Sequence, residues 1–153
     1  MRIFTYTNHS PVWNKPFILE QWKSIDDNSI QGADGTKLIS TFGRVFDTTT
    51  NTFIVPTKIL RAKSDKYDLF ISIKTIINDV VDYKYISVAR VVMIVFYPVP
   101  GMENLEVNHI NGDTENNCVY NLCWCTHAEN VRFAFMNGQI TYQNSDNIRY
   151  LAH

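Results

Sequence analysis

One 24-residue stretch, VNHINGDTENNCVYNLCWCTHAEN at residues 107–130, gathers polar side chains that could do chemistry. It contains six asparagines, and one of them, Asn108, directly precedes His109. A histidine with an ordinary pKa of about 6.5 is largely neutral at physiological pH and can accept a proton from water. Amide oxygens suit Mg²⁺, a hard cation that keeps several waters and takes few protein ligands. These residue types fit a hydrolysis in which a base activates water and a cation takes up charge on a phosphate.

The same stretch predicts the elements that would position these side chains. Residues 105–110 indicate a short strand with Val107 and His109 on one face and Asn108 on the other. Residues 111–113, Asn-Gly-Asp, are a strong turn signal, and a polar loop leads to a second strand at residues 121–125. Thr126 and Glu129 form a capping box that predicts a helix from about residue 127 to 137, ending before Gly138. Such a unit can bring His109 near Asn130.

Upstream, a helix should lead into this unit. Residues 88–96, VARVVMIVF, are apolar nearly all round, with Ser87 available as a cap and Pro98 as a stop. Periodicity alone does not separate a buried helix from a buried strand here.

The earlier part of the chain indicates β-structure. We predict a loop at residues 28–37, followed by a hairpin of residues 38–46 against 52–55 that ends at Pro56. A further strand is predicted at residues 67–75 and a turn at 78–79.

Composition places the chain among globular proteins. Its 153 residues are 45% hydrophobic and 19% charged, enough for one domain with a real core. The net charge of -1 hides an asymmetry, because residues 1–100 hold 12 basic and 9 acidic side chains whereas residues 101–153 hold 2 and 6. No apolar run reaches the length of a signal peptide or a membrane span. We therefore expect a cytoplasmic protein that is not secreted and has no membrane partner.

The three cysteines, Cys118, Cys123 and Cys125, cluster within eight residues and lack a C-x-x-C pair. We interpret them as free thiols, so that zinc is not the expected cofactor. A structural zinc site formed with His127 is the weaker alternative.

The pattern V-N-H-I-N-G-D-x-x-x-N-N-x-x-x-N-L-x-W-C-T-x-x-E-N resembles the HNH endonucleases, in the branch found in phages and mobile introns. Asn121 follows His109 by 12 residues and Asn130 follows Asn121 by 9, as the family's motif requires. The segment F-x-P-x-P after residues 88–96 resembles the family's approach to the motif, which favours a helix there. EQWKSI at residues 20–25 and ISTFGRV at 39–45 resemble a small modular motif often attached to these nucleases.

The resemblance implies a role for each site residue. His109 would be the general base, and Asn121 would hold the loop and the orientation of the histidine, as catalytic residues of the motif. Asn108 and Asn130 would be the ligands of Mg²⁺ or Mn²⁺. A neutral amide at position 108, where many relatives have Asp or His, would bind a divalent cation less strongly than a carboxylate.

The resemblance also implies the fold and the activity. We expect a single α+β domain with an N-terminal β-rich module at 1–86, a connecting helix at 87–97 and a ββα-metal (His-Me finger) nuclease motif at 104–138. The expected activity is metal-dependent endonucleolytic cleavage of double-stranded DNA. The alternative is a nuclease-derived protein that binds DNA or a virion partner without cutting.

Seven side chains are candidates for contacts with DNA. A basic strip could run over phosphates, although exposed charge on a hairpin is the commoner explanation. Arg90 could contact a phosphate or a carboxylate, and His127, in the capping turn, is either structural or faces a phosphate. The strip consists of Arg44, Lys58, Arg61, Lys63 and Lys66.

Overall fold

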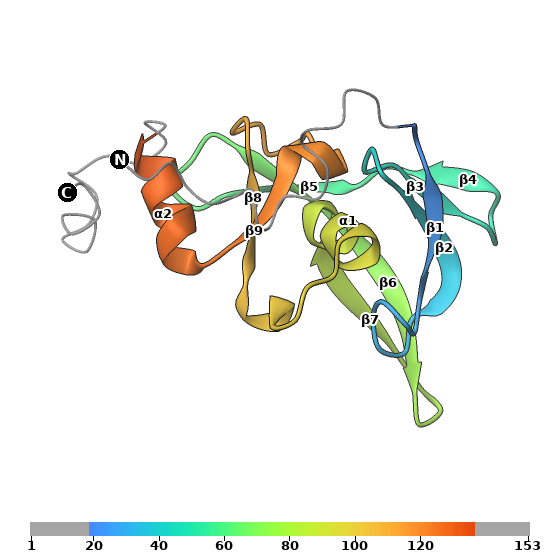
Figure 1. The fold of residues 1–153 in the computed structure, drawn as a ribbon. Helices are drawn as coiled ribbons and strands as arrows, with labels where there is room; N and C mark the ends of the chain where they lie inside the picture. The colour runs from blue at the N-terminus through green and yellow to red at the C-terminus, as the bar shows by residue number, and fades with distance from the viewer. Residues whose placement is uncertain (1–18, 137–153) are drawn as a thin grey trace.

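The computed structural model describes residues 19–136. Its fold is α+β, as expected, and α1 (Val88–Phe96) lies between a four-stranded sheet and a β-hairpin that carries α2 (Figure 1). Residues 1–18 of the predicted N-terminal module, and the predicted helix end at residues 137 and 138, lie outside the described residues.

The first sheet has the order β1-β2-β3-β4 and is antiparallel throughout. Its strands are β1 (Trp22–Asp26), β2 (Asp34–Ser40), β3 (Val45–Asp47) and β4 (Thr52–Ile54). The predicted hairpin exists only between β3 and β4, because a turn at Gly43, with φ +78°, splits residues 38–46 into two strands. The loop predicted at 28–37 is wrong for its second half, since Asp34 begins a strand that pairs on both edges.

The second sheet has the order β5-β6-β7 and ends in a long hairpin that projects from the molecule (Figure 1). Strand β6 (Tyr67–Ile77) contains the predicted strand, and the predicted turn is present at Asn78 and Asp79, both with positive φ. The sequence did not indicate β5 (Thr57–Leu60) or β7 (Val80–Ser87). Both are largely exposed, so neither shows the alternation of a half-buried strand.

The helix α1 spans the predicted residues and forms the centre of the core. Ser87 caps it, because its hydroxyl oxygen accepts from the backbone N–H of Arg90 at 3.3 Å. Five of its nine residues are buried, and the helix contacts both large sheets and the following hairpin. Burial of each large apolar side chain stabilises the fold by about 1.5–3 kcal/mol. The buried residues are Val88, Ala89, Val91, Val92 and Met93.

The third sheet is the predicted hairpin of β8 (Glu106–His109) and β9 (Leu122–Cys125), followed by α2 (His127–Met136). Two short 3-10 helices, η2 (Met102–Asn104) and η3 (Val119–Asn121), precede its strands. The capping box is formed in both directions: Thr126 N–H donates to the Glu129 carboxylate at 2.8 Å, and Glu129 N–H donates to the Thr126 hydroxyl at 3.2 Å. Leu122 and Trp124 are fully buried, as expected of core residues.

The loop between β8 and β9 is fastened to both larger sheets. Val119 N–H donates to the Thr41 carbonyl at 2.8 Å, beside the Gly43 turn. From the second sheet, Lys66 Nζ donates to the Gly112 carbonyl at 2.7 Å, and the Thr114 hydroxyl donates to the Tyr67 carbonyl at 2.5 Å. The loop that follows His109 is therefore held from two sides.

Within residues 19–136, no helix has the length and apolar character that crossing a membrane requires.

Candidate active site

Asn121 closes the loop that follows His109. Its amide donates to Asn111 Oδ1 and to the Asn116 carbonyl, both at 2.9 Å, and its Oδ1 accepts from Asn111 N–H at 3.1 Å. Its own carbonyl accepts from Ile110 N–H at 2.7 Å, next to His109 in the chain. Asn121 thus fixes the backbone next to His109. The side-chain hydrogen bond to His109 comes from Asn117 instead.

His109 is held by Asn117. Its Nε2 lies 2.8 Å from Asn117 Oδ1, and both residues are buried. An amide oxygen only accepts, so in this arrangement Nε2 carries the proton and Nδ1 has the free lone pair. Burial lowers the pKa of His109, against the opposing effects of Asn117 and the Asp68 carboxylate. The ring is therefore neutral at physiological pH.

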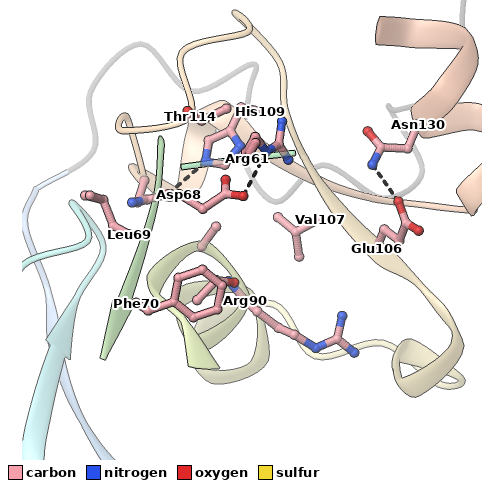
Figure 2. A pocket seen from close by; sticks show the side chains of 13 residues that line it. Arg61, Asp68, Leu69, Phe70, Arg90, Glu106, Val107, His109, Thr114 and Asn130 are labelled. Atoms are coloured by element: carbon pink, nitrogen blue, oxygen red, sulfur yellow. Dashed lines mark hydrogen bonds and ion pairs between the residues drawn. The ribbon is translucent and has the colours of Figure 1, made fainter. Parts of the chain in front are cut away.

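His109 lines a cavity of about 240 Å³ built from four parts of the chain. The second sheet contributes Arg61 and Asp68, whose Nε and Oδ2 form an ion pair at 2.8 Å. Figure 2 shows this pair beside His109, with Val107 between it and the Glu106–Asn130 pair. One histidine, two arginines and two carboxylates thus line a single cavity: His109, Arg61, Arg90, Asp68 and Glu106.

Glu106 joins β8 to the first turn of α2. One carboxylate oxygen accepts from Asn130 Nδ2 at 2.5 Å, and the other is 2.6 Å from His127 Nδ1. Although burial acts to raise it, the hydrogen bonds from Asn130 and His127 hold the pKa of the Glu106 carboxyl below its ordinary value. Glu106 is therefore ionised, and it determines which end of the Asn130 amide faces it.

Asn108 is only 7% exposed, and it is not among the residues that line the cavity of His109. Its Nδ2 is buried without a hydrogen-bond partner among the described residues. An unpaired buried donor costs about 1–3 kcal/mol. An N–H donor does not bind a cation, so the metal-ligand role of Asn108, which would use its Oδ1, stays a prediction.

In the part of the chain that the structure describes, no three His, Cys, Asp or Glu side chains form a metal-binding group. The predicted donors are instead the amide oxygens of Asn108 and Asn130, and of these two residues Asn130 contacts the Glu106 carboxylate. Oxygen donors of this kind fit Mg²⁺ or Mn²⁺. The cysteine thiols donate to backbone carbonyls, for example Cys123 Sγ to Asn108 O at 3.9 Å, and burial raises the pKa of Cys123 to about 12.

Comparison with known proteins agrees with this geometry. The family described as HNH endonuclease matches residues 88–132, from the start of α1 into α2. This segment is therefore similar to an HNH endonuclease motif, and residues 88–132 are called the HNH motif below. It contains His109, Asn121 and Asn130 at the predicted spacing.

A solved structure extends the likeness beyond the HNH motif. It is titled "DNA binding and cleavage by the HNH homing endonuclease I-HmuI" and matches with a TM-score of 0.58 at 24% identity. The match covers 85% of this chain but only 66% of the other chain, so this protein spans slightly less than two thirds of that length. At this identity the likeness shows the fold. No curated protein matches the chain.

Around the HNH motif, most of the predicted DNA-contacting side chains have partners within the protein. Arg44 pairs with Glu20, Lys58 with Glu115 and Arg61 with Asp68, while Lys66 donates to the Gly112 carbonyl. Lys63 sits in the turn between β5 and β6 with a positive φ. Of these five, only Arg61 lines the cavity.

The other two predicted DNA-contacting residues, Arg90 and His127, lie in the HNH motif and make contacts within the protein. Arg90 donates to the Leu105 and Met102 carbonyls at 2.7 and 2.8 Å and lies over the Trp124 ring. His127 contacts Glu106. Whether either side chain also meets a phosphate stays a prediction.

Three cavity residues were not singled out from the sequence. Asn117 lies in the predicted polar loop, eight residues after His109, and its residue type there indicates no more than a loop. Strand alternation would place Glu106 on the face opposite His109, so it does not predict that both residues line one cavity. Asp68 comes from a different sheet, and no local signal indicates its place beside His109.

Proposed function

We propose that this chain is a metal-dependent endonuclease that hydrolyses phosphodiester bonds in double-stranded DNA. The observation that carries the proposal is the position of His109, buried and neutral, in a cavity shared with Arg61, Glu106 and Asn130. The HNH motif and the fold shared with a DNA-cleaving homing endonuclease support this reaction class.

His109 acts as the general base in this proposal. Its Nε2 proton is engaged by Asn117, so the ring presents Nδ1 as the nitrogen that can take a proton from water. The lowered pKa keeps this nitrogen unprotonated at neutral pH. Asn121 supports the arrangement by fixing the backbone on either side of the loop.

Arg61 is the group placed to hold the phosphate. It lies in the cavity with His109 and is paired with Asp68, and this pair keeps the guanidinium in place before DNA arrives. A guanidinium makes strong charge-assisted bonds to phosphate oxygens. An incoming phosphate therefore competes with Asp68 for the same side chain.

A bound Mg²⁺ or Mn²⁺ would supply positive charge to the phosphate and to the leaving 3′ oxygen. Asn108 and Asn130 are the residues that would hold it, as the resemblance implies. Asn130 is suited to this role because its Nδ2 is taken by Glu106, which leaves Oδ1 as its free acceptor.

Supercoiled plasmid incubated with the pure protein in Mg²⁺ or Mn²⁺ tests the proposal. We expect nicked or linear product with wild type, none with His109→Ala, and none in the presence of a chelator. Asn104→Ala serves as a matched control, because Asn104 is exposed and makes no side-chain contact that the structure describes. Equal cleavage by wild type and His109→Ala would contradict the role of His109.

Plasmid that is retarded on a gel but never cut, in either cation, would instead favour the alternative of a binding protein derived from a nuclease.

A further inference from the structure

The two predicted cation ligands carry no negative charge. Asn108 and Asn130 are both neutral amides, and divalent cations prefer a carboxylate to an amide. Among the residues that line the cavity, the carboxylates are Asp68 and Glu106. Before DNA binds, Asp68 is paired with the guanidinium of Arg61 at 2.8 Å, whereas Glu106 contacts Asn130, one of the predicted cation ligands. Glu106 is left as the source of anionic oxygen.

The position of Glu106 suits this role. Glu106 of β8 lines the same cavity as His109 and as Asn130, the predicted ligand from α2. The Glu106 side chain is 40% exposed and reaches the cavity, whereas Asn108 is buried. In Figure 2, Glu106 and Asn130 point toward one another from β8 and α2.

The hydrogen bonds of Glu106 leave it able to bind a cation. An ionised carboxylate has about four lone-pair positions. One oxygen accepts from Asn130 and the other contacts His127, so each oxygen keeps a free position. The contact with Asn130 also turns the amide nitrogen toward Glu106, and Asn130 Oδ1 becomes its available donor to a cation.

We propose that Glu106 is a third ligand of the divalent cation and supplies the negative charge that Asn108 and Asn130 lack. This inference rests on the proposed function for the presence of a cation, and it adds a residue that the resemblance does not assign. The Glu106 carboxylate binds the cation directly, and it orients Asn130 at the same time.

Direct cation binding by the full chain tests the assignment without relying on cleavage. The measurement is the affinity for Mn²⁺, followed as the loss of the free-ion signal in electron paramagnetic resonance. Glu106→Gln keeps the shape and can still accept from Asn130 but removes the charge. Glu103→Gln makes the same charge change on an exposed residue three positions earlier.

We expect Glu106→Gln to weaken Mn²⁺ binding by roughly 10- to 100-fold. Glu103→Gln should bind Mn²⁺ as wild type does, and Glu106→Asp, which restores a carboxylate, should recover part of the affinity. Thermal unfolding in chelator should be similar for wild type and Glu106→Gln, because a purely structural role would appear there instead.

Unchanged Mn²⁺ affinity in Glu106→Gln, or no Mn²⁺ binding by wild type, would overturn the assignment. If wild type cuts plasmid while Glu106→Gln binds Mn²⁺ normally, the ligand assignment fails and the nuclease proposal stands. If Glu106→Gln loses Mn²⁺ but wild type never cuts, the ligand assignment stands and the nuclease proposal fails.

Discussion

Asn117 Oδ1 lies 2.8 Å from His109 Nε2, and the two side chains are buried together. Asn117 in turn rests against the Gly43 turn of the N-terminal sheet, where a Cβ on residue 43 would lie 2.7 Å from Asn117 Cβ. The orientation of the proposed base therefore depends on a loop residue and on a glycine 66 positions away from the histidine. The N-terminal sheet takes part in building the site.

Asn117→Ala should lower the rate of plasmid nicking by about 10- to 100-fold, the size of effect seen when a hydrogen-bond partner that orients a metal-binding histidine is lost. The reason is that the imidazole loses the acceptor that fixes its tautomer and its rotation. Initial rates at saturating Mn²⁺ measure this, with Asn104→Ala as the control. An unchanged rate in a folded Asn117→Ala protein would show that His109 needs no such support.

The pH dependence of the nicking rate should follow the lowered pKa of His109. Because burial holds this pKa below about 6.5, the neutral base persists into mildly acidic solution, and nicking should decline only as pH falls through the folded-state value. A rate profile whose acidic limb lies above pH ~6.5 would contradict the environment seen here.

The same shift has a consequence for stability, with a definite sign. Between the folded and unfolded pKa values the unfolded chain binds more protons at His109, so stability falls as pH drops below about 6.5 and levels off below the folded value. His109→Gln should reduce this part of the pH dependence. Chemical unfolding of both proteins across that range provides the measurement.

Gly43→Ala should be destabilising by roughly 1–3 kcal/mol, because the residue has a positive φ and no room for a methyl group. The closest atoms are the Cβ and carbonyl oxygen of Asn117, so the strain falls on the residue that holds His109. Nicking should fall more than the unfolded fraction explains. Gly101→Ala is the matched control, since Gly101 has the same positive φ but open space around it.

Arg61→Gln should weaken DNA binding by a similar factor for all DNA sequences. Loss of one phosphate contact reduces the slope of log affinity against log salt by about 1. Lys84→Gln, an equal loss of charge on β7 away from the cavity, should leave DNA binding close to that of wild type. If both variants bind alike, Arg61 remains with Asp68 when DNA is present and does not meet a phosphate.

The sequence predicted the elements of the HNH motif because their signals are local. The capping box at Thr126, the serine cap at position 87 and the Asn-Gly turn each act within a few residues, and all three are present. The N-terminal strands were predicted less well. Strand β2 begins in a segment rich in turn formers, and only its pairing with β1 and β3 makes it a strand.

The candidate site was predictable only where its residues are neighbours in the motif. His109, Asn121 and Asn130 follow a fixed spacing, whereas Arg61 and Asp68 reach the cavity through the packing of a separate sheet. The contact of Asn117 with His109 depends on the course of a polar loop that is fastened by Thr41 and Tyr67. The periodicity of the sequence does not predict the course of a loop, so only the structure shows that Asn117 is the partner of His109.

Asn108→Asp should make stability depend on the cation. The side chain is 7% exposed and already has an unsatisfied amide end, so a carboxylate there without a cation is a buried, unpaired charge. That costs on the order of 1–3 kcal/mol or more, and each kcal/mol lowers Tm by about 2–4 °C in a domain of this size. In chelator the variant should therefore melt below wild type.

With Mg²⁺ or Mn²⁺ the order should reverse, because the new carboxylate binds the ion that Asn108 binds weakly. Thermal melts with and without cation, together with Mn²⁺ affinity, measure both effects. Asn104→Asp adds the same charge at an exposed position and should show neither. If the Tm of Asn108→Asp is the same with and without the cation, the ion does not bind at residue 108. Glu106 and Asn130 would then be its protein ligands.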